Sequence, residues 1–110
     1  MTNLRYHHRN YDDGRIGTIC NGTGLTMATE DLIKIRGGLI ANYLDLDGDS
    51  TIEDTINAFD LMENDKRVKV TFVNLFAGVL NLNTFAKGLI IGRKVGGFRK
   101  PVILRLRGLA

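Results

Sequence analysis

Short apolar runs alternate with longer amphipathic stretches along most of the chain. Four of these runs are rich in aliphatic and β-branched residues and predict strands, at residues 16–21, 42–46, 68–75 and 102–106. The stretches between them carry apolar residues at helical spacing and predict helices, at residues 27–36, 51–63 and 79 to about 95. Strands that alternate with helices form a parallel sheet with right-handed crossovers. The pattern therefore predicts an α/β fold, a flavodoxin-like doubly wound parallel sheet of about four strands with helices on both faces.

Turn and cap residues set the expected ends of the first helix. Thr26 or Thr29 is expected to cap its first turn, and Gly37-Gly38 is expected to end it. Cys20 stands in the preceding apolar run, so we expect it to pack in the core as a strand residue.

Residues 1–15 contain no apolar run and are interpreted as a polar leader, in which His7 and His8 are solvated. Residues 16–110 form the single predicted domain, and 44% of the chain is hydrophobic, which is enough for a core. No apolar run approaches the roughly 18–20 residues of a membrane span. The single cysteine excludes an internal disulfide and favours a reducing compartment.

The net charge of +3 conceals an uneven distribution of charge. Residues 37–65 contain eight acids and no Lys or Arg, whereas residues 66–110 contain ten bases and no acid. Such a pattern favours docking on a protein partner of complementary charge. Nucleic-acid binding is not predicted, because no nucleic-acid motif accompanies the bases. Four of them are interpreted as a solvated or docking face: Arg93, Lys94, Arg99 and Lys100.

Three aspartates alternate in the loop after the second predicted strand: Asp45, Asp47 and Asp49. A calcium-binding EF-hand loop that began at Asp45 would need Gly and Glu at its sixth and twelfth positions, where Ser50 and Ile56 stand. The segment before the loop also reads as a strand, whereas an EF-hand requires a helix there. We therefore predict a polar loop in which Asp49, Ser50 or Thr51 caps the following helix, and no calcium site.

The candidate chemistry lies at the carboxyl ends of the predicted strands, where doubly wound sheets bind ligands. These ends are residues 21–24, 45–50 and 74–80. The first of them begins like a dinucleotide-binding G-x-G-x-x-G motif but has Met27 at the third glycine position, so a tight turn is the preferred interpretation. No Ser-His-Asp arrangement and no metal-ligand spacing is present, so neither catalytic nor metal-binding residues are predicted.

Four longer segments occur in order: GRIGTICNGTGLTMATEDLIKIRGG, ANYLDLDGDST, VNLFAGV and PVILRLRG. Together they resemble the C-terminal domain of the succinyl-CoA synthetase (succinate–CoA ligase) β subunit. This resemblance implies a flavodoxin-like domain that supplies part of a site for succinate and a phosphohistidine. It also implies a partner, an α-type subunit that carries CoA and the phosphorylatable histidine. CoA, and ATP or GTP with Mg, are therefore expected elsewhere in the complete enzyme, because the sequence has no ATP-grasp domain.

The resemblance transfers two parts of that site to numbered residues. Asn21 matches a substrate-contacting asparagine, and Gly78, Val79 and Leu80 match the backbone that opens a helix toward the phosphohistidine. The chemistry suits these positions, because the N–H groups at a helix N-terminus attract carboxylate and phosphate and an asparagine can donate to them. Gly78 would let the backbone approach the anion closely.

The sequence departs from the family pattern at two loops. Asp47-Gly48-Asp49-Ser50 stands where the family has GGGA, and Asn81 stands where it has an arginine. Added carboxylates and a lost cation would weaken anion binding. The sequence thus leaves two interpretations open, a succinyl-CoA synthetase domain that is inactive alone, or a non-catalytic structural subunit of a larger assembly. The expected location is the mitochondrial matrix, with the bacterial cytoplasm as the alternative.

Overall fold

The computed structural model describes residues 4–8, 14–21, 23–46, 50–76, 82–95 and 97–107, with the backbone alone at 4–8 and 23–24. These residues form strands and helices in the following order: β1 (Leu4–His8), β2 (Ile16–Cys20), α1 (Thr23–Ile35), β3 (Ile40–Leu46), α2 (Ile52–Asn64), β4 (Val70–Phe76), α3 (Leu82–Lys94) and β5 (Val102–Arg107).

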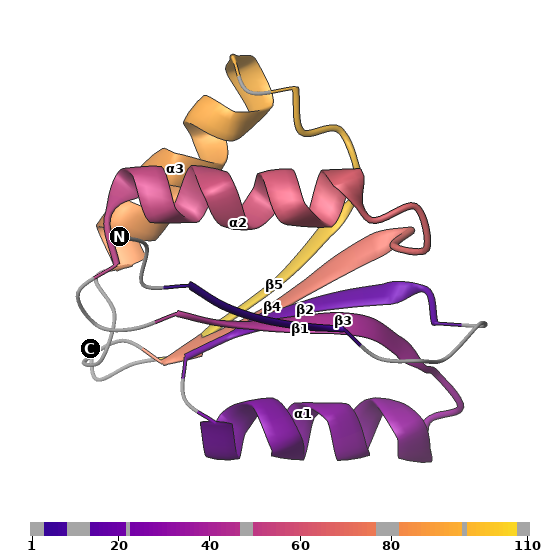
Figure 1. Cartoon of the computed structure of the whole chain (residues 1–110). Coiled ribbons are helices and arrows are strands. Elements are labelled where there is room, and N and C mark those ends of the chain that lie inside the picture. Colours follow the sequence, from indigo (N-terminus) through magenta and orange to yellow (C-terminus); the bar gives the residue numbers. More distant parts are fainter. Residues whose placement is uncertain are drawn as a thin grey trace.

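The strands form one sheet in the order β1-β3-β2-β4-β5. β2 is parallel to both β3 and β4, and β4 is parallel to β5. α1 covers one face of the sheet, and α2 and α3 cover the other (Figure 1). This arrangement confirms the predicted α/β fold, with a four-stranded parallel sheet and helices on both faces.

β1 is a strand that the sequence pattern did not predict. Its lack of an apolar run predicts a polar leader, but the backbone of Leu4–His8 pairs antiparallel with β3, from Leu4 opposite Leu46 to His8 opposite Asn42. The apolar alternation in this segment is confined to Leu4 and Tyr6. Its pairing depends on the open edge of β3, which is a tertiary contact that local periodicity does not reveal.

α1 begins earlier than its apolar spacing predicts. It starts at Thr23, so Thr26 and Thr29 lie inside the helix, and the expectation that one of them caps it is wrong. The Thr29 hydroxyl instead donates to the carbonyl of Leu25, one turn earlier, at 2.7 Å. Threonine hydroxyls compete for backbone carbonyls in this way when they lie within a helix.

The predicted end of α1 is confirmed. Gly37 has a φ of +88°, the left-handed conformation that glycine adopts at low cost. Its N–H donates to the carbonyl of Lys34 at 3.0 Å, and the N–H of Gly38 donates to that of Ile33 at 2.9 Å. These two bonds form a Schellman motif, which satisfies carbonyls at the helix end and turns the chain toward β3.

Of the three residues proposed to cap the second helix, Thr51 does so. Its side chain accepts from the backbone N–H of Asp54 at 3.1 Å, and the Asp54 carboxylate accepts from the N–H of Thr51 at 2.9 Å. This reciprocal pair is a capping box, so the polar loop after β3 leads directly into α2.

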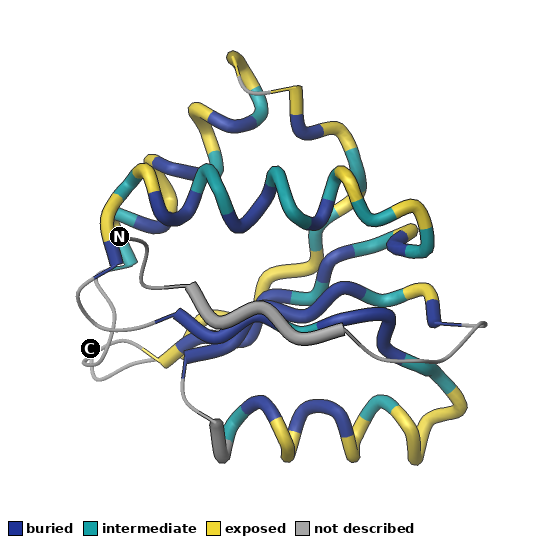
Figure 2. The backbone as a smooth tube through the Cα atoms, viewed as in Figure 1, coloured by how far each residue is buried: buried dark blue, intermediate teal, exposed yellow. Residues whose placement is uncertain are grey.

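The main core lies between the sheet and the pair α2 and α3 (Figure 2). The rings of Phe59 and Phe98 lie 4.7 Å apart and those of Phe59 and Phe85 5.7 Å apart, and all three side chains are buried. Val73 and Leu75 of β4 belong to the same buried cluster. β4 is thereby fixed against both helices, and its carboxyl end is held in a defined place.

Candidate functional site

The carboxyl ends of β2 and β4 lie next to each other in the middle of the sheet. The two strands are parallel neighbours, and their pairing ends with Cys20 opposite Asn74. α1 follows β2 onto one face, whereas α3 follows β4 onto the other (Figure 1). Ligands of doubly wound sheets bind where the crossovers leave for opposite faces. The segments that leave β2 and β4 therefore form the candidate site.

Asn21 directly follows β2, and its side chain binds the backbone at the end of β4. The residue is 6% exposed. Its Nδ2 donates to the carbonyl oxygen of Phe76 at 2.8 Å, and its Oδ1 accepts from the N–H of Phe76 at 2.9 Å. The carboxamide thus extends the pairing of β2 with β4 beyond the last strand residue. These two bonds use one of the two N–H groups of Nδ2.

The substrate contact expected of Asn21 stays a prediction, and the structure adds a second role for the residue, which is to hold the end of β4. The remaining predicted site residues lie outside the described part of the chain: Gly78, Val79 and Leu80. Residues 47–49 of the acidic loop lie outside it as well. The described residues that border this loop are Leu46 and Ser50, and Ser50 is 7% exposed.

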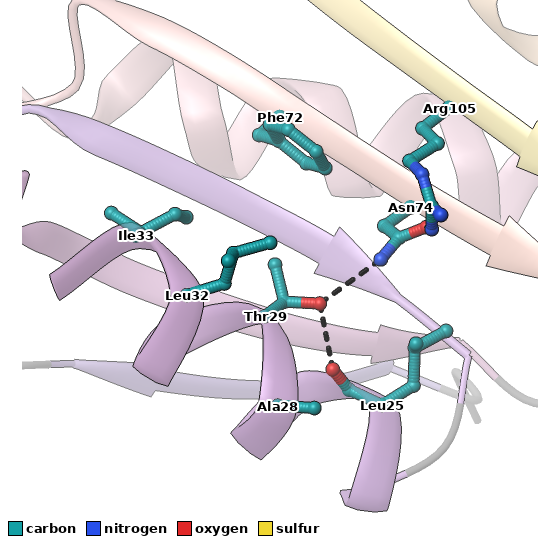
Figure 3. A pocket seen from close by; sticks show the side chains of 8 residues that line it. All are labelled: Leu25, Ala28, Thr29, Leu32, Ile33, Phe72, Asn74 and Arg105. Carbon is teal, nitrogen blue, oxygen red and sulfur yellow. Dashed lines mark hydrogen bonds between the residues drawn. The ribbon is translucent and has the colours of Figure 1, made fainter. Parts of the chain in front are cut away.

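A hydrogen-bond relay next to the candidate site joins α1, β2, β4 and β5. Figure 3 shows its part from Asn74 through Thr29 to Leu25. Arg105 of β5 donates from Nη1 to Oδ1 of Asn74 at 3.1 Å. Asn74 donates from Nδ2 to the hydroxyl of Thr29 at 3.1 Å, and Thr29 donates to the carbonyl of Leu25. The thiol of Cys20 also donates to the Thr29 hydroxyl, at 3.7 Å. We call this set the α1 relay.

Cys20 is fully buried at the end of β2, as the sequence predicts. Burial raises the pKa of its thiol, hydrogen bonding to Thr29 and Thr26 opposes the rise, and the carboxylate of Asp45 adds to it. A thiol in this environment stays protonated at neutral pH and is a poor nucleophile. The residue therefore serves packing and the α1 relay.

An open groove runs between α1 and the strands β4 and β5 (Figure 3). Its volume is about 240 Å³, and it is lined mainly by apolar side chains, with the polar side chains of the α1 relay beside them. The lining residues are Leu25, Ala28, Thr29, Leu32, Ile33, Phe72, Asn74 and Arg105. Ile103, which pairs with Phe72, is 55% exposed, so the apolar surface continues onto β5.

Four basic residues lie between the end of α3 and the start of β5, near the amino ends of the strands and opposite the candidate site: Arg93, Lys94, Arg99 and Lys100. Lys100 donates to the carbonyls of Met62 and Asp65 at the end of α2, at 2.8 and 2.7 Å. The Arg93 guanidinium lies 4.7 Å from the ring centre of Phe98. These cations stabilise the carboxyl end of α2 and its neighbours, and they are remote from the candidate site.

The described residues contain no group of three or more His, Cys, Asp or Glu that could hold a metal ion. Across the same residues, every helix is too short or too polar to cross a membrane.

The α1 relay was not predicted from the sequence. Asn74 was recognised as part of a strand end, and Arg105 as part of a family motif. Their contact follows from the register of β4 and β5, in which the two residues are paired. The alternation of Ile103, Arg105 and Arg107 was the available signal, because it puts the two arginines on one face of the strand.

Comparisons with known proteins find one family that matches most of the chain. Residues 19–110 match the sequence model of the CoA-ligase family. The chain is 43% identical over 96 residues to the β subunit of succinate–CoA ligase (ADP-forming) from Hydrogenobaculum sp., which covers 87% of this chain and 25% of the relative. It is 42% identical over 96 residues to the mitochondrial β subunit from Columba livia, which covers 87% of this chain and 23% of the relative. The chain thus spans about a quarter of the length of these relatives.

A solved structure has a similar fold. The ATP citrate lyase of Methanosaeta concilii, solved with (3S)-citryl-CoA, superposes with a TM-score of 0.71 and 24% identity, which covers 96% of this chain and 29% of that chain. At this identity the likeness concerns the fold alone.

Proposed function

Because the chain belongs to the CoA-ligase family, we propose that it works as the CoA-ligase domain of a succinyl-CoA synthetase β subunit. The overall reaction would convert succinate, CoA and a nucleoside triphosphate to succinyl-CoA, nucleoside diphosphate and phosphate, through a phosphohistidine. The observation that carries the proposal is the match of residues 19–110 to the family. The position of Asn21 supports it, because this residue lies within the matched range and directly follows β2, at the strand ends where doubly wound sheets bind ligands.

The proposed contribution of this chain is to hold an anion at the ends of β2 and β4. Asn21 would donate its second Nδ2 hydrogen to a carboxylate or phosphate oxygen, while its first stays on the carbonyl of Phe76. Gly78, Val79 and Leu80 would offer backbone N–H groups to the same anion. Asn21 would then couple substrate contact to the position of the segment that leaves β4.

The proposed partner is an α-type CoA-ligase subunit that carries the CoA and the phosphorylatable histidine. ATP or GTP with Mg would bind an ATP-grasp domain outside this sequence. β5 supports contact with further polypeptide, because Ile103, Leu104 and Leu106 are between 42% and 55% exposed. The proposed location is the mitochondrial matrix or the bacterial cytoplasm, since the relatives include bacterial and mitochondrial proteins.

A second candidate function is that of a non-catalytic structural subunit in a larger assembly. The observation that favours it is that both the Oδ1 and the Nδ2 of Asn21 already bind the backbone of Phe76, which is a structural use of this side chain. Asp47 and Asp49 favour it as well, because their carboxylates would repel an anionic substrate. Two like unit charges at ~4 Å repel by about 4 kcal/mol at an effective dielectric near 20.

Binding to a purified α-type subunit tests the proposed partnership. We expect the chain to co-elute in size-exclusion chromatography with the α subunit of one of the bacterial relatives. The relative's own β subunit serves as the positive control. A chain that elutes as a monomer beside that α subunit, under conditions where the control β subunit binds, would contradict the proposal.

A further inference from the structure

We propose that Arg105 is a positioning residue: it fixes the direction of the α1 relay and thereby holds the start of α1 against the ends of β2 and β4. Arg105 is an exposed residue of β5, and it reaches Asn74 on the neighbouring strand with a hydrogen bond of 3.1 Å. It is separated in sequence from Leu25, the acceptor at the other end of the relay, by most of the chain.

The guanidinium determines the orientation of the Asn74 carboxamide because it can only donate. Facing a donor, Asn74 must present Oδ1 to Arg105, and its Nδ2 must then point toward Thr29. The reversed carboxamide would set an N–H group against the guanidinium. Asn74 is 6% exposed, so water offers little alternative to these partners.

The orientation of Asn74 passes to the helix through Thr29, which is 4% exposed. Since the Thr29 oxygen accepts from Asn74, its own hydrogen is available for the carbonyl of Leu25 in the first turns of α1. A reversed Asn74 would offer Oδ1 to Thr29, and the hydroxyl would then have two acceptors competing for one hydrogen. Arg105 therefore favours one of two hydrogen-bond patterns inside the relay.

The α1 relay is adjacent to the proposed anion site at both strand ends. Cys20, which donates to Thr29, directly precedes Asn21, and Asn74 lies two residues before Phe76. Asn21 and Phe76 are the pair that joins the two strand ends. A change in the relay would thus shift the two segments from which the proposed site is built, without any contact between Arg105 and the anion.

Three substitutions at this exposed position separate the direction of the hydrogen bond from its mere presence. Arg105→Lys keeps a side chain that only donates, Arg105→Glu supplies one that only accepts, and Arg105→Gln can do either. We expect the side-chain amide signals of Asn74 in NMR spectra to keep their positions in Arg105→Lys. We expect them to shift in Arg105→Glu, and to double or broaden in Arg105→Gln.

The reactivity of Cys20 gives a second readout, because the thiol is fully buried beneath α1 and labels only when the helix opens. We expect a thiol reagent to label Arg105→Glu about tenfold faster than Arg105→Lys, the effect of losing a hydrogen bond to a charged group. Equal labelling rates and equal Asn74 signals in the Lys and Glu variants would overturn the inference, and Arg105 would then be a solvated side chain.

Only the functional consequence of the inference rests on the proposed function, and a separate titration decides it. In the complex with an α-type subunit, we expect Arg105→Glu to bind succinate about three- to tenfold more weakly than Arg105→Lys. Equal succinate affinities with unequal Cys20 labelling would show that Arg105 orients the α1 relay but does not affect succinate binding. If the unsubstituted complex binds no succinate, the proposed function fails, while the amide signals and the labelling rates still decide the role of Arg105.

Discussion

At the scale of single residues, Cys20 is the titratable group among the described residues whose pKa is clearly shifted. Its pKa is raised by burial, so over a range of alkaline pH the folded protein keeps the thiol proton while the unfolded chain releases it. The folded state then binds more protons than the unfolded state. The contribution of the thiol to the free energy of unfolding is therefore fully present below the pKa of the unfolded thiol, and it is lost as pH rises toward the pKa of the folded thiol. We expect the free energy of unfolding, measured by urea denaturation, to fall from about pH 8 to pH 10.

Cys20→Ala is the matched control for this pH dependence. The substitution lowers stability at every pH, because it removes buried atoms, but it also removes the titrating thiol. The two proteins differ in no other residue. The difference in stability between the two proteins should therefore shrink as pH rises from 8 to 10. A difference that stays constant over this range would show that the thiol does not contribute.

The sequence predicted one of the described residues at the candidate site, but it did not predict the contacts that this residue makes. Asn21 was singled out because it lies at the end of a predicted strand and matches a position of the family motif, and its substrate contact stays a prediction. The pairing of its carboxamide with Phe76, 55 residues away, follows from the neighbouring positions of β2 and β4. The contact between Arg105 and Asn74 was not predicted, because one sequence shows on which face of a strand a side chain lies but not which strands are neighbours.

At the scale of elements, α2 and α3 approach closely at Gly88. A Cβ at this position would lie 2.5 Å from the Cβ of Thr55 and 2.6 Å from its Cγ2. A contact this short forces the two helices apart, and overpacking of a core typically costs about 1–3 kcal/mol. We expect Gly88→Ala to be about 1–3 kcal/mol less stable than Gly92→Ala in urea denaturation, because both substitutions gain the same helix propensity and only Gly88→Ala meets Thr55.

Gly92 lies one turn later in α3 and provides the control. A Cβ built there meets no atom within 4 Å among the described residues. Alanine favours a helix over glycine by about 0.8–1.0 kcal/mol. Gly92→Ala is therefore expected to be neutral or stabilising. If both substitutions destabilise the protein equally, the close packing of α2 against α3 does not explain the effect of Gly88→Ala.

Helices and strands were predicted where their own sequence carries the signal, and they were missed where they depend on a contact with another element. The three helices and the four parallel strands carry their own periodicity, and the capping box and the Gly37 turn carry local signals that the sequence displays. β1 lacked such a signal, because it exists as a strand through its pairing with β3. The first turn of α1 was missed because Gly22 and Gly24 indicate a turn, whereas the backbone at Thr23 is already helical.

At the scale of the whole molecule, the two edges of the sheet have different tasks. The edge at the amino ends of the strands uses Lys100 and Arg93 to hold the end of α2 and the segment before β5. At the carboxyl ends of the strands, Asn21 joins β2 to β4 through its two hydrogen bonds to the backbone of Phe76. We expect Lys100→Ala to lower the free energy of unfolding in urea denaturation, because it removes the hydrogen bonds from the ammonium group to the carbonyls of Met62 and Asp65.

The central claim is that this chain supplies a working CoA-ligase domain to a succinyl-CoA synthetase β subunit. The most direct test is a chimera, in which this chain replaces the 96-residue matching segment of the Hydrogenobaculum β subunit, combined with the α subunit of that relative. We expect succinate-dependent formation of succinyl-CoA by the assembled chimera, and none by this chain alone. A chimera that assembles with the α subunit but forms no succinyl-CoA would contradict the claim and favour the structural subunit.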